Sequence, residues 1–219
     1  RAACLAFCLA PPTGGSMSTS PAVSEPRQRP TYVVYLAGPE VFLPEALQAG
    51  REKKERLVER SRASAWPFRL EGLYPLDTEL ADFQNDRATA LSIYRGNVRL
   101  IEQADAVLAN MVRFRGPSMD VGTAFEMGLA RGLGKPVFGY YDAAPFYGAP
   151  EAPAEYAARV AAFYGTPAHA ARDPHGHQIE SFGLVDNLML VGALDDTGYD
   201  VATSFDEAID DIARHFLGA

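Results

Sequence analysis

The sequence predicts a single α/β domain built on a doubly wound parallel sheet. Short apolar runs alternate along the chain with longer segments of helical character, which is the pattern of strands separated by helices. The runs are continuously apolar, as expected for strands covered by helices on both faces of a sheet. A length of 219 residues suits one such domain with a full core and is short for two.

Four β-branched or aromatic runs are predicted to be strands, at residues 32–37, 70–75, 106–111 and 137–140. The first ends at Gly38-Pro39, which signals a sharp turn. Helices are predicted over residues 44–62, 88–103, 120–132, 154–164 and 204–217. This order indicates a Rossmann-like or flavodoxin-like sheet.

Local signals fix several of the helix ends. Asp120 is placed to cap the third helix, and Gly132 and Gly134 lie where that helix should stop. Ser204-x-x-Glu207 is a capping box that opens the last helix. The charged run at residues 51–56 is interpreted as the solvated face of the first helix.

The third helix is unusual because Ala124, Gly128 and Gly132 leave one of its faces nearly bare of side chains. Each glycine costs about 1 kcal/mol of helix propensity relative to alanine. Such a helix makes room for a backbone or a ligand, and Glu126 on it suggests a carboxylate at the floor of a small-molecule pocket. The alternatives are that Glu126 is a solvated surface residue and that Asp120 is only a cap.

The first thirty residues differ in kind from the rest. Residues 1–10 are apolar, and the next twenty are rich in Pro, Ser, Thr and Gly without periodicity, so we expect a disordered or artificially added arm over 1–30 and the α/β domain over 31–219. Met17 is a plausible natural start, although a remnant of a secretory signal is an alternative. Cys4 and Cys8 both lie in this arm, which excludes disulfides and thiolate metal sites from the predicted domain.

Composition excludes several classes of function. The net charge of −8 and the pI near 5.0 argue against a nucleic-acid or acidic-membrane partner, which would need a basic patch. The sequence lacks G-x-G-x-x-G after the first strand, the phosphate-binding G-x-x-x-x-G-K-[ST] motif and G-x-S-x-G. We therefore expect a soluble, cytoplasmic protein with no cofactor and no metal, whose chemistry depends on carboxylates and tyrosines.

Polar residues gather where the predicted strands end. They lie at 35–42, 77–79 and 110–120. In open parallel sheets ligands bind beyond the carboxyl ends of the strands, so these segments should converge near the start of the helix that carries Glu126.

Five segments resemble the nucleoside 2-deoxyribosyltransferases, in the same order and at similar separations. They are Y-V-V-Y-L-A-G-P-E-V-F (32–42), Y-P-L-D (74–77), I-Y-R-G-N-V-R-L-I-E-Q-A-D-A-V-L-A-N (93–110), F-R-G-P-S-M-D-V-G-T-A-F-E-M-G-L-A (114–130) and F-G-L-V-D-N-L-M-L (182–190). The D-V-G-T-A-F-E-x-G helix together with the Y-L-A-G-P strand is the most specific part, and the resemblance spans about residues 32–216.

The resemblance implies transfer of 2-deoxyribose between nucleobases without phosphate or cofactor. Glu126 matches the family nucleophile, which would attack C1′ and hold the sugar as an ester, with retention of configuration. Tyr35 matches the tyrosine that bonds this carboxylate; the alternative is an ordinary core aromatic. A hydrogen bond to the charged form would keep burial from raising the carboxyl pKa too far.

Other matching positions are implied to bind substrate. Asp120 matches the carboxylate that binds the sugar hydroxyls, and Asn187 matches an asparagine that reaches a neighbouring subunit's substrate, which implies a homo-oligomer with a shared active site. The alternative for Asn187 is a turn residue. The remaining implied substrate-binding residues, at positions near the base, are Gly38, Phe42, Asp77 and Glu79.

Asn97 departs from the better-known members, which have an aspartate there to assist proton transfer. An asparagine cannot be a general acid, although it can hydrogen-bond a base edge. Some purine-preferring relatives look similar at this position, so the resemblance favours purine deoxynucleosides.

Two other hypotheses for the function remain open. One is an N-glycosidic hydrolase of nucleosides or nucleoside 5′-monophosphates, in which Arg113 and Arg115 would bind a phosphate. The other is a non-catalytic nucleotide-binding module that has kept the fold.

Overall fold

The structure is a computed structural model that describes residues 29–77, 84–167 and 169–218. The predicted N-terminal arm falls almost entirely outside the described residues, as does Glu79.

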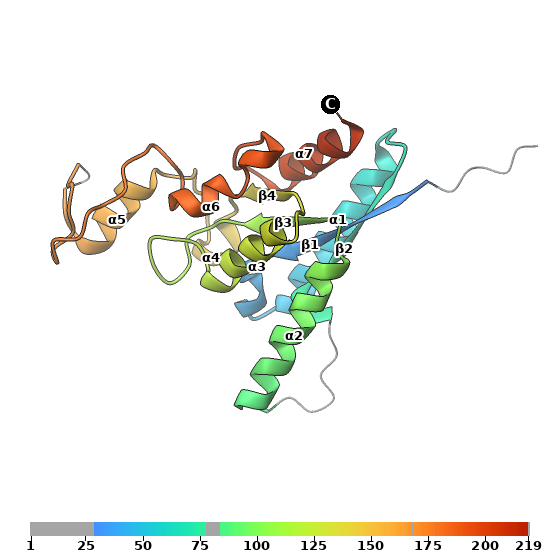
Figure 1. The fold of residues 1–219 in the computed structure, drawn as a ribbon, viewed down its shortest axis with the longest axis horizontal. Helices are drawn as coiled ribbons and strands as arrows, with labels where there is room; N and C mark the ends of the chain where they lie inside the picture. Colours follow the sequence, from blue (N-terminus) through green and yellow to red (C-terminus); the bar gives the residue numbers. More distant parts are fainter. Residues whose placement is uncertain (1–28, 78–83, 168, 219) are drawn as a thin grey trace, which may run out of the picture.

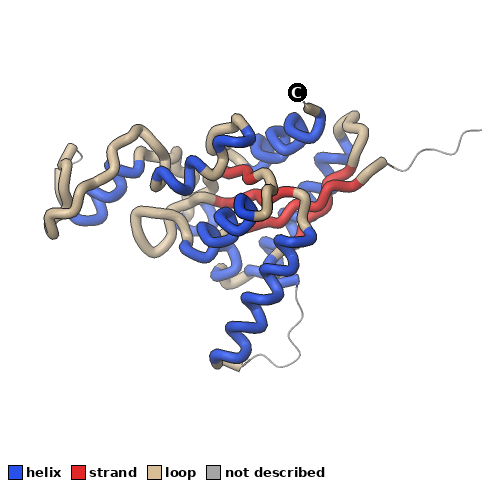
Figure 2. The backbone as a smooth tube through the Cα atoms, viewed as in Figure 1, coloured by secondary structure: helices blue, strands red, loops and turns tan. Residues whose placement is uncertain are grey.

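Four parallel strands form the centre of the protein (Figure 2). They are β1 (Thr31–Ala37), β2 (Arg69–Leu73), β3 (Ala106–Asn110) and β4 (Val137–Tyr140), in the spatial order β2-β1-β3-β4. Tyr35 of β1 lies opposite Leu73 of β2 and Val107 of β3. The chain goes from β1 to β2 on one side and then returns across β1 to β3 on the other side, so the ends of β1 and β3 form the switch point at which such sheets bind ligands. The predicted doubly wound parallel sheet is confirmed.

Helices surround this sheet (Figure 1). In the described part of the chain they are α1 (Ala46–Ala63), α2 (Arg87–Gln103), α3 (Val121–Gly132), α4 (Ala144–Tyr147), α5 (Tyr156–Tyr164), α6 (Leu188–Gly192) and α7 (Phe205–Leu217), with 3-10 turns η1 (Pro39–Phe42), η2 (Pro75–Asp77) and η3 (Asp195–Thr197). The five predicted helices are confirmed to within two residues at each end. The short helices α4 and α6 were not predicted, because four or five residues do not establish a helical period.

Alternate strand residues enter two separate cores. Val34 and Leu36 pack with α1 and α7 on one face of the sheet. Tyr35 and Ala37 pack with α2 and α3 on the other face. The odd-numbered position of Tyr35 therefore directs its side chain to the face that carries Glu126.

The predicted helix ends are observed. The Asp120 carboxylate accepts from the backbone N–H of Thr123 at 2.9 Å, and Gly134 has a φ of 72° just after α3. Ser204 Oγ accepts from the N–H of Glu207 at 3.2 Å, but the Glu207 carboxylate returns to the N–H of Thr203 instead of that of Ser204.

The interpretation of residues 51–56 as a merely solvated face is wrong for Lys53, whereas Lys54 and the exposed Arg56 form ion pairs at the surface. Lys53 pairs with the buried carboxylate of Glu40, Lys54 with Asp77, and Arg56 with Asp206. The charge pattern could not show this because all three partners come from other elements. These pairs connect α1 to η1, to η2 and to α7.

Among the described residues, no helix has the length and apolar character needed to cross a membrane. The same residues contain no group of three or more His, Cys, Asp or Glu side chains arranged to hold a metal ion.

Two glycines in the helices allow a matched test of packing. A Cβ at Gly128 in α3 would meet nothing within 4 Å among the described residues, whereas a Cβ at Gly50 in α1 would lie 2.4 Å from the ring of Tyr74. We expect Gly128→Ala to stabilise the protein by up to about 1 kcal/mol through helix propensity. Gly50→Ala should cost about 2–3 kcal/mol, because the buried ring of Tyr74 must move.

Urea unfolding of the two variants beside wild type measures both effects. A loss of stability in Gly128→Ala would contradict the prediction and would show that this face of α3 is covered in solution.

Candidate active site

The site is built around one hydrogen bond between the sheet and α3. The Tyr35 hydroxyl donates to Glu126 Oε1 at 2.5 Å. Tyr35 is fully buried in β1, and Glu126 is half-buried in the second turn of α3. These residues are 91 positions apart in the sequence, so the pair is a product of the fold and not of local structure.

Burial dominates the electrostatics of this pair. Loss of solvent raises the pKa of Glu126 to about 7; the hydrogen bond from Tyr35 acts in the opposite direction, and the nearby Asp120 charge adds to the increase. Burial, and then the charge of Glu126, raise the pKa of Tyr35 far above its ordinary value. Tyr35 is therefore a permanent donor, and Glu126 changes charge near neutral pH.

Glu126 opens into a cavity of about 320 Å³ between α2 and α3. The other residues that line it are Tyr94, Asn97, Val98, Ile101, Gly122 and Phe125. The rings of Tyr94 and Phe125 are 6.0 Å apart and half-exposed, so they form an apolar wall open to solvent. A small planar ligand has room here beside the carboxylate.

The bare face of α3 does not supply this room. Gly122 borders the cavity, whereas Gly128 and Gly132 do not line it and face open space in the described structure. Gly128 and Gly132 therefore leave the face of α3 open, as expected, but they do not form the cavity at Glu126.

Asn97 lines the same cavity and has an acceptor atom that is unpaired in the described structure. Its Oδ1 is buried and has no hydrogen-bond partner among the described residues. A buried amide oxygen without a partner costs free energy, so it is a natural place for a donor group of a ligand.

Asp120 is the N-cap of α3 and lies six residues before Glu126. It is buried, and its Oδ2 accepts from both the backbone N–H and the hydroxyl of Thr123, at 2.9 and 3.1 Å. No hydrogen bond to its Oδ1 is recorded in the described structure. Asp120 can cap the helix with one oxygen and bind a hydroxyl group with the other.

Gly38 and Phe42 follow β1 at the switch point. A Cβ at Gly38 would lie 2.0 Å from Glu40 Oε2, so a larger residue there would require the buried Glu40 side chain to move. Phe42 is 53% exposed, and its ring stacks on that of Phe114 with centroids 5.2 Å apart. The two rings make an exposed aromatic surface at the ends of β1 and β3.

Asp77 is held away from Glu126 by local contacts. One of its oxygens accepts from the N–H of Tyr74 at 2.8 Å, and the other pairs with Lys54. The structure does not bring it to the Glu126 cavity.

Asn187 also has its own local partners. Its Oδ1 accepts from the N–H of Met189 at 3.0 Å, which caps α6, and its Nδ2 donates to Glu180 at 2.7 Å. No contact with Glu126 or Asp120 of the same chain is recorded in the described structure. The alternative of a simple turn residue is replaced by that of a helix cap.

Two buried carboxylates were missed by the sequence predictions. Asp186 accepts from Ser118 Oγ, from the N–H of Met119 at 3.0 Å and from the N–H of Asn187 at 2.8 Å, and it pairs with the buried Arg159. It thus holds the residue before Asp120 and the backbone of Asn187 at the same time. The only sequence signal was its position next to Asn187.

Glu40 is the second of these carboxylates. It accepts from Asn110 Nδ2 at 2.7 Å and from the Tyr140 hydroxyl at 3.3 Å, in addition to its pair with Lys53. It therefore ties the turn after β1 to the ends of β3 and β4. In the sequence it was only one letter of the Y-L-A-G-P-E-V-F segment.

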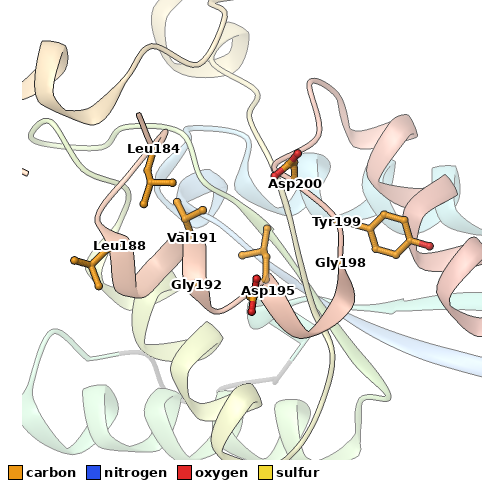
Figure 3. A pocket seen from close by; sticks show the side chains of 9 residues that line it. Leu184, Leu188, Val191, Gly192, Asp195, Gly198, Tyr199 and Asp200 are labelled. Atoms are coloured by element: carbon orange, nitrogen blue, oxygen red, sulfur yellow. The ribbon is translucent and has the colours of Figure 1, made fainter. Parts of the chain in front are cut away.

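A second cavity, of about 440 Å³, lies along residues 184–200 (Figure 3). Leu184, Leu188 and Val191 gather at one end, and Tyr199 and Asp200 lie at the other. It contains none of the predicted site residues, so it is separate from the Glu126 cavity.

Known proteins resemble this chain in sequence and in fold. Residues 34–189 match the family model described as nucleoside 2-deoxyribosyltransferase. The solved structure of a 2-desoxiribosyltransferase from Leishmania mexicana is 28% identical with a TM-score of 0.59, covering 84% of this chain and 98% of that one.

Two further proteins are similar to this chain but give no information on its activity. A conserved protein from Enterococcus faecalis is 18% identical with a TM-score of 0.52, over 84% of this chain and 98% of its own, and supports the fold alone. An uncharacterized protein of Schizosaccharomyces pombe is 28% identical over 200 residues, covering 86% of this chain and 90% of the relative.

The raised pKa of Glu126 predicts a stability change that depends on pH. Because the folded-state pKa is about 7 and the ordinary value is 4.5, the wild-type protein loses stability as the pH rises between these values. Glu126→Gln cannot ionise and still accepts from Tyr35, so it should be more stable above pH 7. A shift of this size corresponds to at most about 3 kcal/mol, and partial exposure reduces the expected gain to about 1–2 kcal/mol.

Urea unfolding at pH 5 and at pH 8 measures this gain. It should be small at pH 5 and largest at pH 8; an equal gain at both would show that ionisation of Glu126 is not its cause.

Proposed function

The chain belongs to the nucleoside 2-deoxyribosyltransferase family, and on that premise we propose that it transfers 2-deoxyribose between nucleobases by a double displacement at Glu126. The observation that carries this proposal is the Tyr35–Glu126 hydrogen bond beside an open cavity. A desolvated carboxylate held by one donor is the form of nucleophile that the reaction needs.

In the first displacement a Glu126 oxygen attacks C1′ of the deoxynucleoside. The C1′–N bond breaks, the base leaves with the bonding electrons, and the sugar is held as a glutamyl ester. In the second displacement a nitrogen of another base attacks C1′ and releases the carboxylate. Two inversions at one carbon retain its configuration.

The environment of Glu126 suits a carboxylate that is the nucleophile in the first displacement and the leaving group in the second. With a pKa near 7 it is about half ionised at neutral pH, and desolvation leaves the anion more reactive than an exposed carboxylate. Tyr35 stabilises the anion while its own hydroxyl stays protonated. Tyr35 therefore sets the balance between ionisation and reactivity.

Substrate contacts follow from the rest of the site. We assign the free side of Asp120 to the sugar hydroxyls and Asn97 to the base edge. Asn97 lines the cavity and cannot donate a proton as an acid. Because some purine-preferring relatives look similar at this position, we propose purine deoxynucleosides as the preferred substrates. Phe42 supplies an exposed ring near the base.

We further propose that the working protein is a cytoplasmic homo-oligomer formed by a domain over 31–219. Asn187 caps α6 and has no recorded contact with Glu126 or Asp120 in its own chain. It lies on a segment with exposed Leu188 and Met189, which supports its role at a neighbour's site.

Base exchange is the first test of this function. Wild type incubated with deoxyinosine and free adenine, without phosphate, should produce deoxyadenosine, and Glu126→Ala should produce none above background. Deoxythymidine as donor should react more slowly than deoxyinosine if purines are preferred. Chromatography of the reaction identifies the products, and hypoxanthine without deoxyadenosine would replace the transferase by a hydrolase.

Tyr35→Phe should change the pH profile of the reaction. Removing the hydrogen bond that lowers the pKa of Glu126 should move the acidic limb of kcat/KM to higher pH, so that activity falls more at pH 6 than at pH 8.5. The matched control is Tyr74→Phe, because the buried Tyr74 hydroxyl has no hydrogen-bond partner within the described residues. A uniform loss at all pH values in Tyr35→Phe would indicate a purely structural role.

A further inference from the structure

The loop between β3 and α3 holds one backbone position under strain. Arg115 has a φ of 55°, and among the described residues it is the only one other than glycine with a positive φ. A long side chain is unusual in this left-handed region. Such strain persists where the surrounding structure enforces it, and it often marks a ligand site.

The two arginines of this loop differ in their ion pairs. Arg113 is already engaged: its guanidinium pairs with Glu151 at 3.0 Å and lies 3.8 Å from the ring centre of Tyr147. Arg115 is exposed and makes no ion pair within the described part of the chain. Its charge is therefore available to a ligand.

Arg115 is held instead against the aromatic surface at the switch point. Its guanidinium carbon lies 4.7 Å from the ring centre of Phe42 and 4.7 Å from that of Phe114. Cation–π contacts at exposed positions are weak, so a ligand with well-placed acceptors can draw the guanidinium away from the rings.

We propose that Arg115 selects 6-oxopurine bases, by donating two hydrogen bonds to the O6 and N7 acceptors of hypoxanthine or guanine. This inference rests on the proposed function, in which Phe42 lies beside the base. A purine attached through N9 keeps O6 and N7 free, and the guanidinium fork matches this pair of acceptors. Adenine presents an amino donor in place of O6, which cannot accept from the fork.

Arg115 and Asn97 then read different parts of the base. Asn97 lines the Glu126 cavity and is adjacent to the reacting carboxylate, whereas Arg115 does not line that cavity. We therefore assign Arg115 to selection of the base and not to transfer of the sugar.

The test is a competition between two acceptors in one reaction. Deoxyguanosine serves as the donor, hypoxanthine and adenine are present at equal concentration, and chromatography gives the ratio of deoxyinosine to deoxyadenosine. Wild type should favour deoxyinosine. Arg115→Asn, which tolerates the left-handed backbone, should lower this ratio about tenfold, since a bidentate pair supplies discrimination of that order.

Arg113→Asn is the matched control, because it removes an arginine from the same loop and should leave the ratio unchanged. Arg115→Lys keeps the charge and the stem but loses the fork, so its ratio should also fall. A ratio in Arg115→Asn or Arg115→Lys equal to that of wild type would overturn the inference.

The inference and the proposed function fail in different ways. If wild type forms neither product, base exchange itself is absent and the proposed function fails. If wild type forms both products and the Arg115 variants keep the same ratio, only the selection of the base by Arg115 fails.

Discussion

The hydrogen bond between Tyr35 and Glu126 is the constraint on which the arrangement of the site depends. A carboxylate withdrawn from water needs a donor whose position does not change, and the middle of a buried strand provides it. This requires α3 to cross the sheet directly over β1 and β3, with Met127 and Ala130 packed in the same core as Tyr35. The fold therefore sets the pKa of Glu126, because the same packing that removes water also brings the hydroxyl into place.

Local sequence patterns predicted the fold and the Asp120 cap, but not the pairing of Tyr35 with Glu126. Strands of continuous apolar residues and helices with clear caps are local patterns. The doubly wound parallel sheet and the Asp120 cap could therefore be predicted. The partnership of Tyr35 with Glu126 spans 91 positions, and only the resemblance to a family suggested it. The rule that ligands bind beyond the carboxyl ends of parallel strands predicted that the segments carrying these two residues converge, but composition and periodicity do not show which side chains pair.

The features that could not be predicted share one physical cause, which is that polar groups became buried through tertiary contacts. Asp186 and Glu40 are ordinary acidic letters in the sequence, yet both are buried and accept several hydrogen bonds. Lys53 belongs to a run that reads as a solvated face, but it pairs with Glu40. Side-chain burial depends on the whole chain, so a local pattern cannot reveal it.

Asp186 has a consequence for the proposed oligomer. It holds the N–H of Met119, which precedes Asp120, and the N–H of Asn187. Asp120 serves the site of its own chain, whereas Asn187 is proposed to serve that of a neighbour. Arg159 and Ser118 hold the Asp186 carboxylate from its other sides. Any movement of this carboxylate would therefore displace Asp120 and Asn187 together. Adjacent active sites would then be positioned by the same buried carboxylate, and the geometry of one site would depend on that of the next.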